Sequence, residues 1–247
     1  MTSSHDKYSL FQAKIDLTAT LRWADRLGFT EGICNHFSML VPGTTDRFLL
    51  NPQGIHWSEL KASDLLIVNP EGHVLEGKHQ IEPTALFIHS RIHLNRPSAK
   101  CILHTHMPYA TALTCLAGGR LEWCSQSALR YYGRVAYDET FNGLALDVAE
   151  GDRMCARLGD CDILFLANHG VIVVGDDLAC AFDDLYYLER VCQLQVLAHS
   201  TGLPLKIISE EVCQATFEQI KDSREQSYLF LEAIKRILTR ESPEFLE

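Results

Sequence analysis

Two apolar stretches separated by a tight turn constrain the fold of this chain more than any other feature of its sequence. They cover residues 162–167 and 171–174, and only Asn168-His169-Gly170 lies between them. Short apolar runs of this kind are typical of strands buried in a sheet, and Asn and Gly are favoured in tight turns. The sequence therefore predicts two neighbouring strands, in a sheet that needs helices packed on its faces.

Helical and β-rich segments are interleaved along the rest of the chain. The other predicted strands cover residues 36–41, 47–51, 65–69, 73–76 and 100–106. The predicted helices cover residues 8–27, 83–94, 147–158, 178–200 and 210–240, with a further one starting near Pro108. We expect a single α/β domain over residues 1–247, with three α/β/α layers around a central, largely antiparallel sheet. Its core takes in about residues 10–205, followed by a C-terminal helix over about 209–240.

Composition and charge limit the kinds of partner that this protein can bind and the cell compartment in which we expect it. The chain has 247 residues, 47% of them hydrophobic, and 32 acidic against 22 basic side chains give a net charge of −10. This balance excludes a function built on attraction to nucleic acid or to an anionic membrane surface. The nine cysteines form no C-x-x-C pair, and neither an N-terminal apolar segment nor an apolar run of membrane-spanning length occurs. We therefore expect reduced thiols and a cytoplasmic protein.

Histidines supply the best local signal for chemistry. His104 and His106 are two residues apart on a predicted apolar strand, so both rings point to one face and can bind one metal ion. His169 lies on the turn between apolar strands, where a polar ring needs a partner. Hydrogen-bonded or surface histidines, and a simple hairpin turn, explain the same pattern. His89 and His93 share a helix face, and we interpret them as surface or interface residues rather than a second metal pair.

Four motifs, in order along the chain, carry a resemblance to a known family. They are Gly32-Ile-Cys-Asn35-His-Phe-Ser38, Asn51-Pro-Gln-Gly54-Ile-His56, Arg96-Pro97 leading into His104-Thr105-His106, and Asn168-His169-Gly170. With these motifs the chain resembles class II aldolases and the adducin head domain over nearly its whole length. The resemblance implies a class II aldolase-like fold and a cyclic homotetramer.

The resemblance also implies a metal centre. The histidines that match the family's ligands are His104, His106 and His169, and the metal is divalent, with zinc expected and manganese or iron as alternatives. Three imidazoles leave a coordination position open, which is the pattern of a catalytic site. In aldolases of this kind the metal polarises substrate oxygens so that an enediolate can form.

Two matching loops imply where a small-molecule substrate binds. In the relatives these loops offer backbone amides and side chains to the substrate's anionic end, and glycine permits that close approach. Asn35, Gly54 and His56 are the corresponding candidates here. Turn formation alone explains the same residues.

The sequence departs from the family pattern at the acid/base residue. Counting back from the matched histidines places Ala85 where the sugar-phosphate aldolases carry a glutamate. Glu82 lies about one helical turn earlier and is our candidate for the proton-transfer carboxylate, although it also suits the positive end of a helix. Tyr131 is a candidate proton donor, as is its neighbour Tyr132, and packing is the alternative role for both.

Together these residues predict a divalent-metal-dependent lyase that breaks or makes a carbon–carbon bond next to a carbonyl through a metal-bound enolate. Aldol cleavage and decarboxylation of a small hydroxy- or oxo-carbonyl compound both fit. The missing glutamate favours decarboxylation, since loss of CO2 needs no base to remove a hydroxyl proton. Two alternatives are a non-catalytic, adducin-like interaction or assembly module and a non-haem iron oxygenase on the same histidines.

Overall fold

A mostly antiparallel sheet runs through the middle of the molecule. The structure, a computed structural model, describes residues 9–247, so Tyr8, where the first helix was predicted to begin, lies outside it. The strands are β1 (His36–Leu40), β2 (Phe48–Leu50), β3 (Leu66–Val68), β4 (Val74–Glu76), β5 (Cys101–Thr105), β6 (Val135–Asp138), β7 (Ile163–Leu166) and β8 (Gly170–Gly175). Their order is β4-β3-β2-β1-β5-β8-β7-β6, and only the β6–β7 pair is parallel. The predicted sheet is confirmed.

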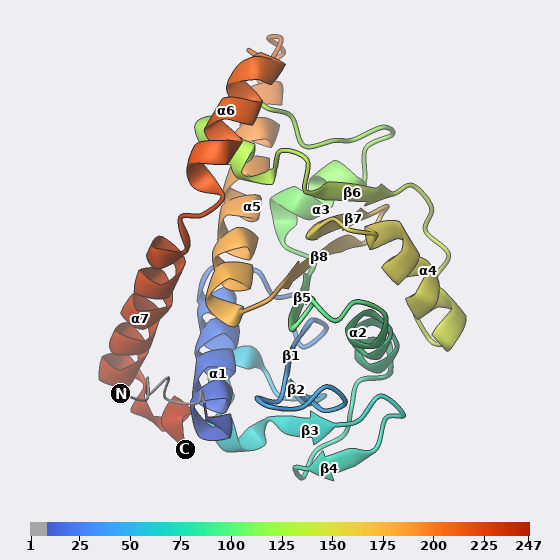
Figure 1. The fold of residues 1–247 in the computed structure, drawn as a ribbon, viewed down its shortest axis with the longest axis vertical. Helices are drawn as coiled ribbons and strands as arrows, with labels where there is room; N and C mark the ends of the chain where they lie inside the picture. Colours follow the sequence, from blue (N-terminus) through green and yellow to red (C-terminus); the bar gives the residue numbers. More distant parts are fainter. Residues whose placement is uncertain (1–8) are drawn as a thin grey trace, which may run out of the picture.

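Helices cover both faces of this sheet. They are α1 (Leu10–Arg26), α2 (Pro83–Asn95), α3 (Pro108–Thr114), α4 (Val148–Leu158), α5 (Leu178–His199), α6 (Glu210–Ile220) and α7 (Arg224–Glu241). Figure 1 shows α1, α5 and α7 on one side of the sheet and α2 and α4 on the other. Because strand side chains alternate, Leu103 of β5 joins the core shared with α1 and α5, whereas Ile102 joins the core under α2 and α4. The three-layer α/β/α arrangement is confirmed.

Strand β6 is the one strand that the sequence pattern does not predict. Its residues Val-Ala-Tyr-Asp are mostly half-buried, at the edge of the sheet. It pairs in parallel with β7, to which it is joined through α4. Parallel neighbours need such a crossover, so no tight turn marks the pair in the sequence.

The C-terminal helix predicted over residues 210–240 is two helices. The helical segment stops at Ile220, and α7 starts at Arg224 with Ser223 in the capping position. Asp222 and Ser223 lie at the break, and both residue types have a low propensity for the interior of a helix. In Figure 1, α6 lies beside the upper end of α5, and α7 runs down past α1.

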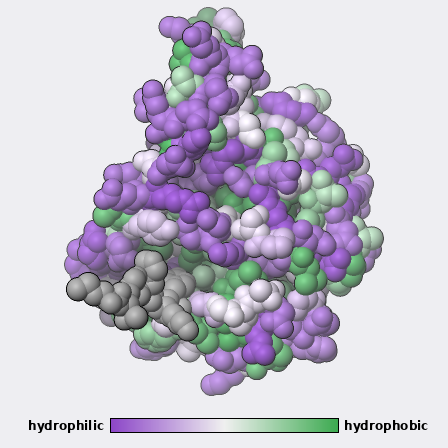
Figure 2. Space-filling model, viewed as in Figure 1, coloured by the Kyte–Doolittle hydropathy of each residue, from purple (hydrophilic) through white to green (hydrophobic). Residues whose placement is uncertain are grey.

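The described surface is largely polar on the face drawn in Figure 2, with scattered apolar patches. No helix of the described residues is long and apolar enough to cross a membrane.

Candidate metal centre

Strand β5 carries two histidines to the end of the sheet. His104 is buried on the strand, and His106 follows Thr105, the last residue of β5. The chain then turns into α3 at Pro108, which suits the first turn of a helix because it has no N–H to leave unpaired. Both histidines therefore leave the sheet on the same side, as the sequence spacing predicts.

A strained turn delivers the third histidine. Leu166 and Gly170 are the last paired residues of strands β7 and β8 before the turn. Within the turn, Asn168 adopts a left-handed φ of 56°. Asparagine tolerates this conformation better than most residues. Gly170 matters for a different reason: a Cβ there would lie 2.5 Å from the Thr105 carbonyl oxygen. The turn thus brings His169 up against the end of β5.

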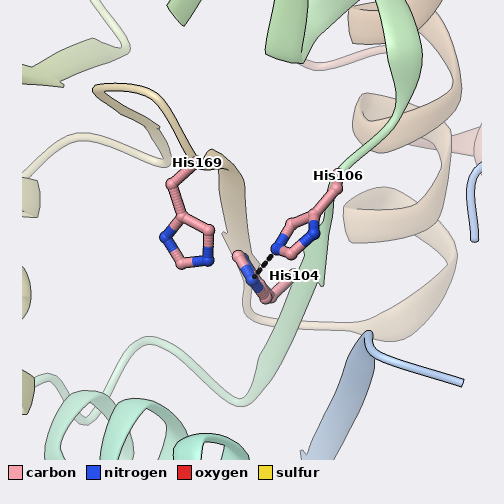
Figure 3. Close-up of side chains that lie close together, drawn as sticks. All are labelled: His104, His106 and His169. Carbon is pink, nitrogen blue, oxygen red and sulfur yellow. Dashed lines mark hydrogen bonds between the residues drawn. The ribbon is translucent and has the colours of Figure 1, made fainter. Parts of the chain in front are cut away.

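The three rings converge on one point (Figure 3). One nitrogen from each of His104, His106 and His169 lies within 4.8 Å of the others. The ring centroids are 4.8 Å apart between His104 and His169 and again between His106 and His169. The sequence predicts these three histidines as metal ligands, and the structure places their rings close together.

Hydrogen bonds at the outer nitrogens leave the inner nitrogens free to bind a metal. His104 Nδ1 donates to the Val171 carbonyl oxygen at 2.9 Å, and His106 Nδ1 donates to the Glu31 carboxylate at 2.5 Å. Both Nε2 atoms then face each other at 3.1 Å. Two nitrogens bound to a tetrahedral zinc lie roughly 3.3 Å apart. Because two lone pairs at this distance repel unless a cation or a proton lies between them, the arrangement fits a metal.

Burial favours the neutral form of two of these imidazoles, those of His104 and His169. It lowers the pKa of His104 well below its usual range, with a further contribution from the nearby His169. The pKa of His169 falls to about 4, through burial and the proximity of His106. A neutral ring is the form that binds a metal.

Asn35 lies immediately before β1, whose first residue, His36, stacks on His104. Its Oδ1 accepts the Glu31 N–H at 2.9 Å, and its carbonyl oxygen accepts from Asn51 Nδ2 at 3.2 Å. Its own Nδ2 is buried and has no partner among the described residues. A buried donor without a partner is costly, so this amide is available to a bound molecule.

The observation that decides which family the chain belongs to is a match to a family model. The model of the Class II Aldolase and Adducin N-terminal domain matches residues 15–196. This chain belongs to the class II aldolase and adducin family.

Individual relatives agree with this assignment. A protein of Pseudomonas aeruginosa, provisionally named a class 2 aldolase, is 34% identical over 211 residues, which cover 85% of this chain and 80% of that protein. Human beta-adducin is 30% identical over 240 residues, but these are 90% of this chain and only 32% of the adducin.

Solved structures agree as well. An aldolase II superfamily protein from Pseudomonas syringae aligns over 100% of both chains with a TM-score of 0.89 and 31% identity. L-fuculose 1-phosphate aldolase from Glaciozyma antarctica aligns over 97% of this chain and 95% of its own, with a TM-score of 0.85 and 26% identity. The class II aldolase fold is therefore shown over the described chain.

In this class II aldolase family member, Glu82 caps a helix and also approaches the centre. Its Oε2 accepts the Ala85 N–H at 2.7 Å and the Thr84 hydroxyl. The same oxygen lies 3.9 Å from His36 Nε2, and the His36 ring stacks on His104 with centroids 4.8 Å apart. Glu82 is thus separated from the metal ligands by His36.

Ala85, which counting back from the matched histidines places where the sugar-phosphate aldolases carry a glutamate, offers no functional group. It is fully buried against Phe48, Leu50, Leu66 and Val68. The acid/base carboxylate of the sugar-phosphate aldolases therefore has no counterpart at this position.

No hydrogen bond or ion pair among the described residues links Gly54 or His56 to the three histidines. Gly54 has a φ of +85°, so a turn that L residues rarely adopt accounts for glycine there. His56 caps the short helix Trp57–Glu59 through Ser58 and lies 3.5 Å from Asp25. These are local contacts, and none of them connects these two residues to the metal ligands.

The predicted proton donor, Tyr131, is also placed elsewhere. Its ring is completely buried, and its hydroxyl donates to the Asp184 carbonyl oxygen at 2.6 Å. Burial raises the pKa of this phenol well above its usual range. Its neighbour Tyr132 lies 3.2 Å from Glu210 of α6. Packing, the alternative role, accounts for Tyr131, and the structure gives no support to proton donation by it.

His89 and His93 are not surface residues, and this expectation is wrong. Both are buried, and both contact the hydroxyl of Ser38 on β1, at 2.5 Å and 2.8 Å. Helix α2 packs against β1, so the helix face that they share points into the molecule.

Two carboxylates that the sequence pattern did not single out support the ligands. Glu31 holds His106 through the short contact to Nδ1. Glu189 of α5 accepts the N–H groups of Tyr109 and Ala110, each at 2.8 Å, in the first turn of α3 just after His106. Burial raises the pKa of the Glu189 carboxyl to about 7. Both partners come from distant parts of the chain, so no local motif marks them.

Replacing Glu31 with glutamine is expected to weaken metal binding. The carboxylate fixes the His106 tautomer that leaves Nε2 free, and loss of such a partner typically costs about 10–100-fold in metal affinity. Competition against a zinc chelator of known affinity measures the change. Glu71→Gln, at an exposed turn, is the control and should bind zinc like the wild type. Equal affinity in Glu31→Gln would show that Glu31 does not orient His106.

Proposed function

We propose that this protein is a divalent-metal-dependent lyase acting on a small carbonyl compound. The observation that carries the proposal is the convergence of three histidine nitrogens, two of them held with Nε2 free by outer hydrogen bonds. Membership of the class II aldolase family and similarity to an L-fuculose 1-phosphate aldolase support the same reaction class.

The ligands in this proposal are His104, His106 and His169, with zinc as the expected metal. A divalent metal bound by them would act as a Lewis acid that polarises a substrate carbonyl oxygen. Three protein ligands leave a position for that oxygen, whereas a structural zinc normally has four.

Asn35 is the proposed substrate-side contact. Its unpartnered Nδ2 can donate to an anionic or carbonyl oxygen, and burial strengthens such a bond because water does not compete. Glu82 contributes indirectly in this proposal, by fixing Thr84 and the start of α2.

Two reactions remain within the proposal. Aldol cleavage needs a group that takes the proton of a substrate hydroxyl, and decarboxylation does not. With Ala85 in place of the family's glutamate, the usual acceptor of the hydroxyl proton is missing. The residues that border the three histidines therefore decide between aldol cleavage and decarboxylation.

A non-catalytic role is the second candidate. Ala85 and the 30% identity to human beta-adducin favour an adducin-like interaction module. The preserved metal ligands favour the enzyme, because a binding surface has no need of three converging imidazoles.

We further propose a homo-oligomer, a tetramer by family resemblance, that works in the cytoplasm. Large apolar side chains are exposed on the arm formed by the end of α5, by α6 and by the loop between them, and such exposure is typical of association surfaces. They are Leu194, Leu197, Leu203, Ile207 and Val212. The cysteines are free, which suits a reducing compartment.

Metal analysis combined with turnover tests the proposal. Protein purified without chelator is expected to contain about one divalent metal per chain, identified by inductively coupled plasma mass spectrometry. A panel of hydroxy-carbonyl compounds and oxo-acids should reveal turnover that chelator removes and zinc restores. Metal below about 0.2 per chain, even after incubation with zinc, would contradict the metal centre. Metal without any turnover would favour the adducin-like module, and iron with oxygen consumption would favour an oxygenase.

A further inference from the structure

A chain of buried hydrogen bonds leads from α2 to the metal ligands. It consists of His93, Ser38, His89 and His36, and we call it the histidine relay. His93 Nδ1 lies 2.8 Å from the Ala99 carbonyl oxygen, and its Nε2 lies 2.8 Å from Ser38 Oγ. Ser38 Oγ lies 2.5 Å from His89 Nδ1, and His89 Nε2 lies 2.7 Å from His36 Nδ1. Every member is at most 5% exposed.

The relay can run in only one direction. A carbonyl oxygen only accepts, so His93 Nδ1 carries a hydrogen and Nε2 of the neutral ring accepts from the Ser38 hydroxyl. Because the Ser38 hydroxyl donates its one hydrogen to His93, its oxygen can only accept from His89 Nδ1–H. His89 Nε2 is then bare and accepts from His36 Nδ1–H. The last nitrogen, His36 Nε2, is therefore left as a lone pair.

The rings of the relay are treated as neutral because each is buried, and a buried charge without a counterion is costly. At the far end of the relay, burial lowers the pKa of His93 to about 4. A cation bound at His104 would oppose a positive charge on His36 further.

The lone pair of His36 has poor partners within the protein. Its nearest polar contacts are Thr84 Oγ1 at 3.5 Å and Glu82 Oε2 at 3.9 Å. The Thr84 hydroxyl donates to Glu82 through a short bond, and a carboxylate has no hydrogen to offer. The nitrogen therefore remains an acceptor that is nearly unused.

This acceptor borders the metal ligands. His36 lies opposite His104 in the pairing of β1 with β5, and the two rings stack at an interplanar angle of 29°. Thr84 precedes Ala85, the position at which the family's carboxylate is missing. A nitrogen acceptor thus lies beside the place where the relatives have an oxygen acceptor.

We propose that His36 Nε2 accepts a hydrogen bond from a substrate hydroxyl, so that the substrate is a compound with a hydroxyl next to its metal-binding oxygen. The inference rests on the proposed function and chooses between its two reactions: it favours hydroxy-carbonyl compounds over oxo-acids. His36 holds and orients this hydroxyl, and the relay holds His36 in the tautomer that can do so.

The tautomer is tested first, in the full-length protein with and without zinc. Long-range ¹H–¹⁵N correlation spectra distinguish a bare imidazole nitrogen from one that carries a hydrogen. We expect a bare Nε2 and a protonated Nδ1 on His36 in both samples. A hydrogen on Nε2 would overturn the proposal, and this result needs no variant and no activity.

Binding of matched probes tests the contact itself. Glycolate and acetate differ by one hydroxyl, and calorimetric titration of the zinc-loaded protein should show about five- to tenfold tighter binding of glycolate, the range of one net hydrogen bond. In His36→Phe, which keeps a ring against His104, the ratio should fall to about one. His73→Phe, at an exposed histidine, should retain the wild-type ratio.

The outcomes separate the two proposals. Wild-type protein that takes up no zinc contradicts the proposed function, while the spectra still decide the tautomer. Zinc-loaded His36→Phe that keeps the wild-type preference for glycolate overturns the role of His36 alone. Ser38→Ala gives a second variant if His36→Phe does not fold, since it breaks the relay, frees the tautomer of His36 and should reduce the preference.

Discussion

Replacement of His104 by alanine is expected to abolish stoichiometric metal binding. The variant loses one of three protein ligands, whereas removal of an outer-shell partner alone already costs about 10–100-fold in affinity. We expect a loss of more than about 100-fold in zinc affinity, and turnover of any substrate found for the wild type should disappear with the metal. Chelator competition and elemental analysis measure the first effect, and steady-state kinetics the second.

A loss of fold must be separated from a loss of ligand. His104 is 1% exposed and its Nδ1 satisfies the Val171 carbonyl oxygen, so the alanine variant is also less stable. His169→Ala is the matched test, because His169 is partly exposed on a turn and should lose metal with less damage. His199→Ala, at the exposed end of α5, should behave as the wild type. Full zinc occupancy in His104→Ala or in His169→Ala would contradict the three-histidine centre.

Replacement of Gly170 by alanine is expected to damage both stability and metal binding. The added Cβ would lie 2.5 Å from the Thr105 carbonyl oxygen and 2.9 Å from Cδ2 of the His106 ring. Forcing such contacts apart typically costs about 1–3 kcal/mol in the free energy of unfolding. Displacement of a ligand ring should in addition weaken zinc binding by about tenfold or more. Denaturant unfolding of the metal-free protein and chelator competition measure the two effects.

Gly151→Ala separates a packing effect from a ligand effect. A Cβ at Gly151 would lie 2.3 Å from the Phe87 carbonyl oxygen, where α4 packs on α2. We expect a comparable loss of stability with zinc affinity unchanged. If Gly170→Ala keeps wild-type zinc affinity, the close approach of β8 to β5 does not govern the position of His106.

The sequence alone was sufficient to predict that His104, His106 and His169 come together, because their geometry is local. The two-residue spacing of His104 and His106 fixes a shared strand face, and the short Asn-His-Gly turn fixes His169 at a hairpin end. The layered fold followed in the same way, from short apolar runs interleaved with helices.

The partners of these ligands could not be predicted because they come from distant segments. His36 and His89 are 53 residues apart, and Glu31 and His106 are 75 apart. Histidines on a helix face that turns inward look the same in the sequence as histidines on a surface. The bond from Tyr131 to the Asp184 carbonyl oxygen could not be predicted for the related reason that the sequence does not specify which way this ring points.

The pairing of β1 with β5 places His36 opposite His104 and Phe37 opposite Leu103. Alternate residues face opposite helical layers, so a slip of this pairing by one residue would push imidazoles into the apolar core and turn Phe37 or Leu103 toward the polar site. A chain that has misassembled its central strands therefore has no complete ligand set. A metal bound at the proposed centre would then report on conformation as well as on chemistry, because only a molecule with the correct pairing of β1 and β5 would hold the ion.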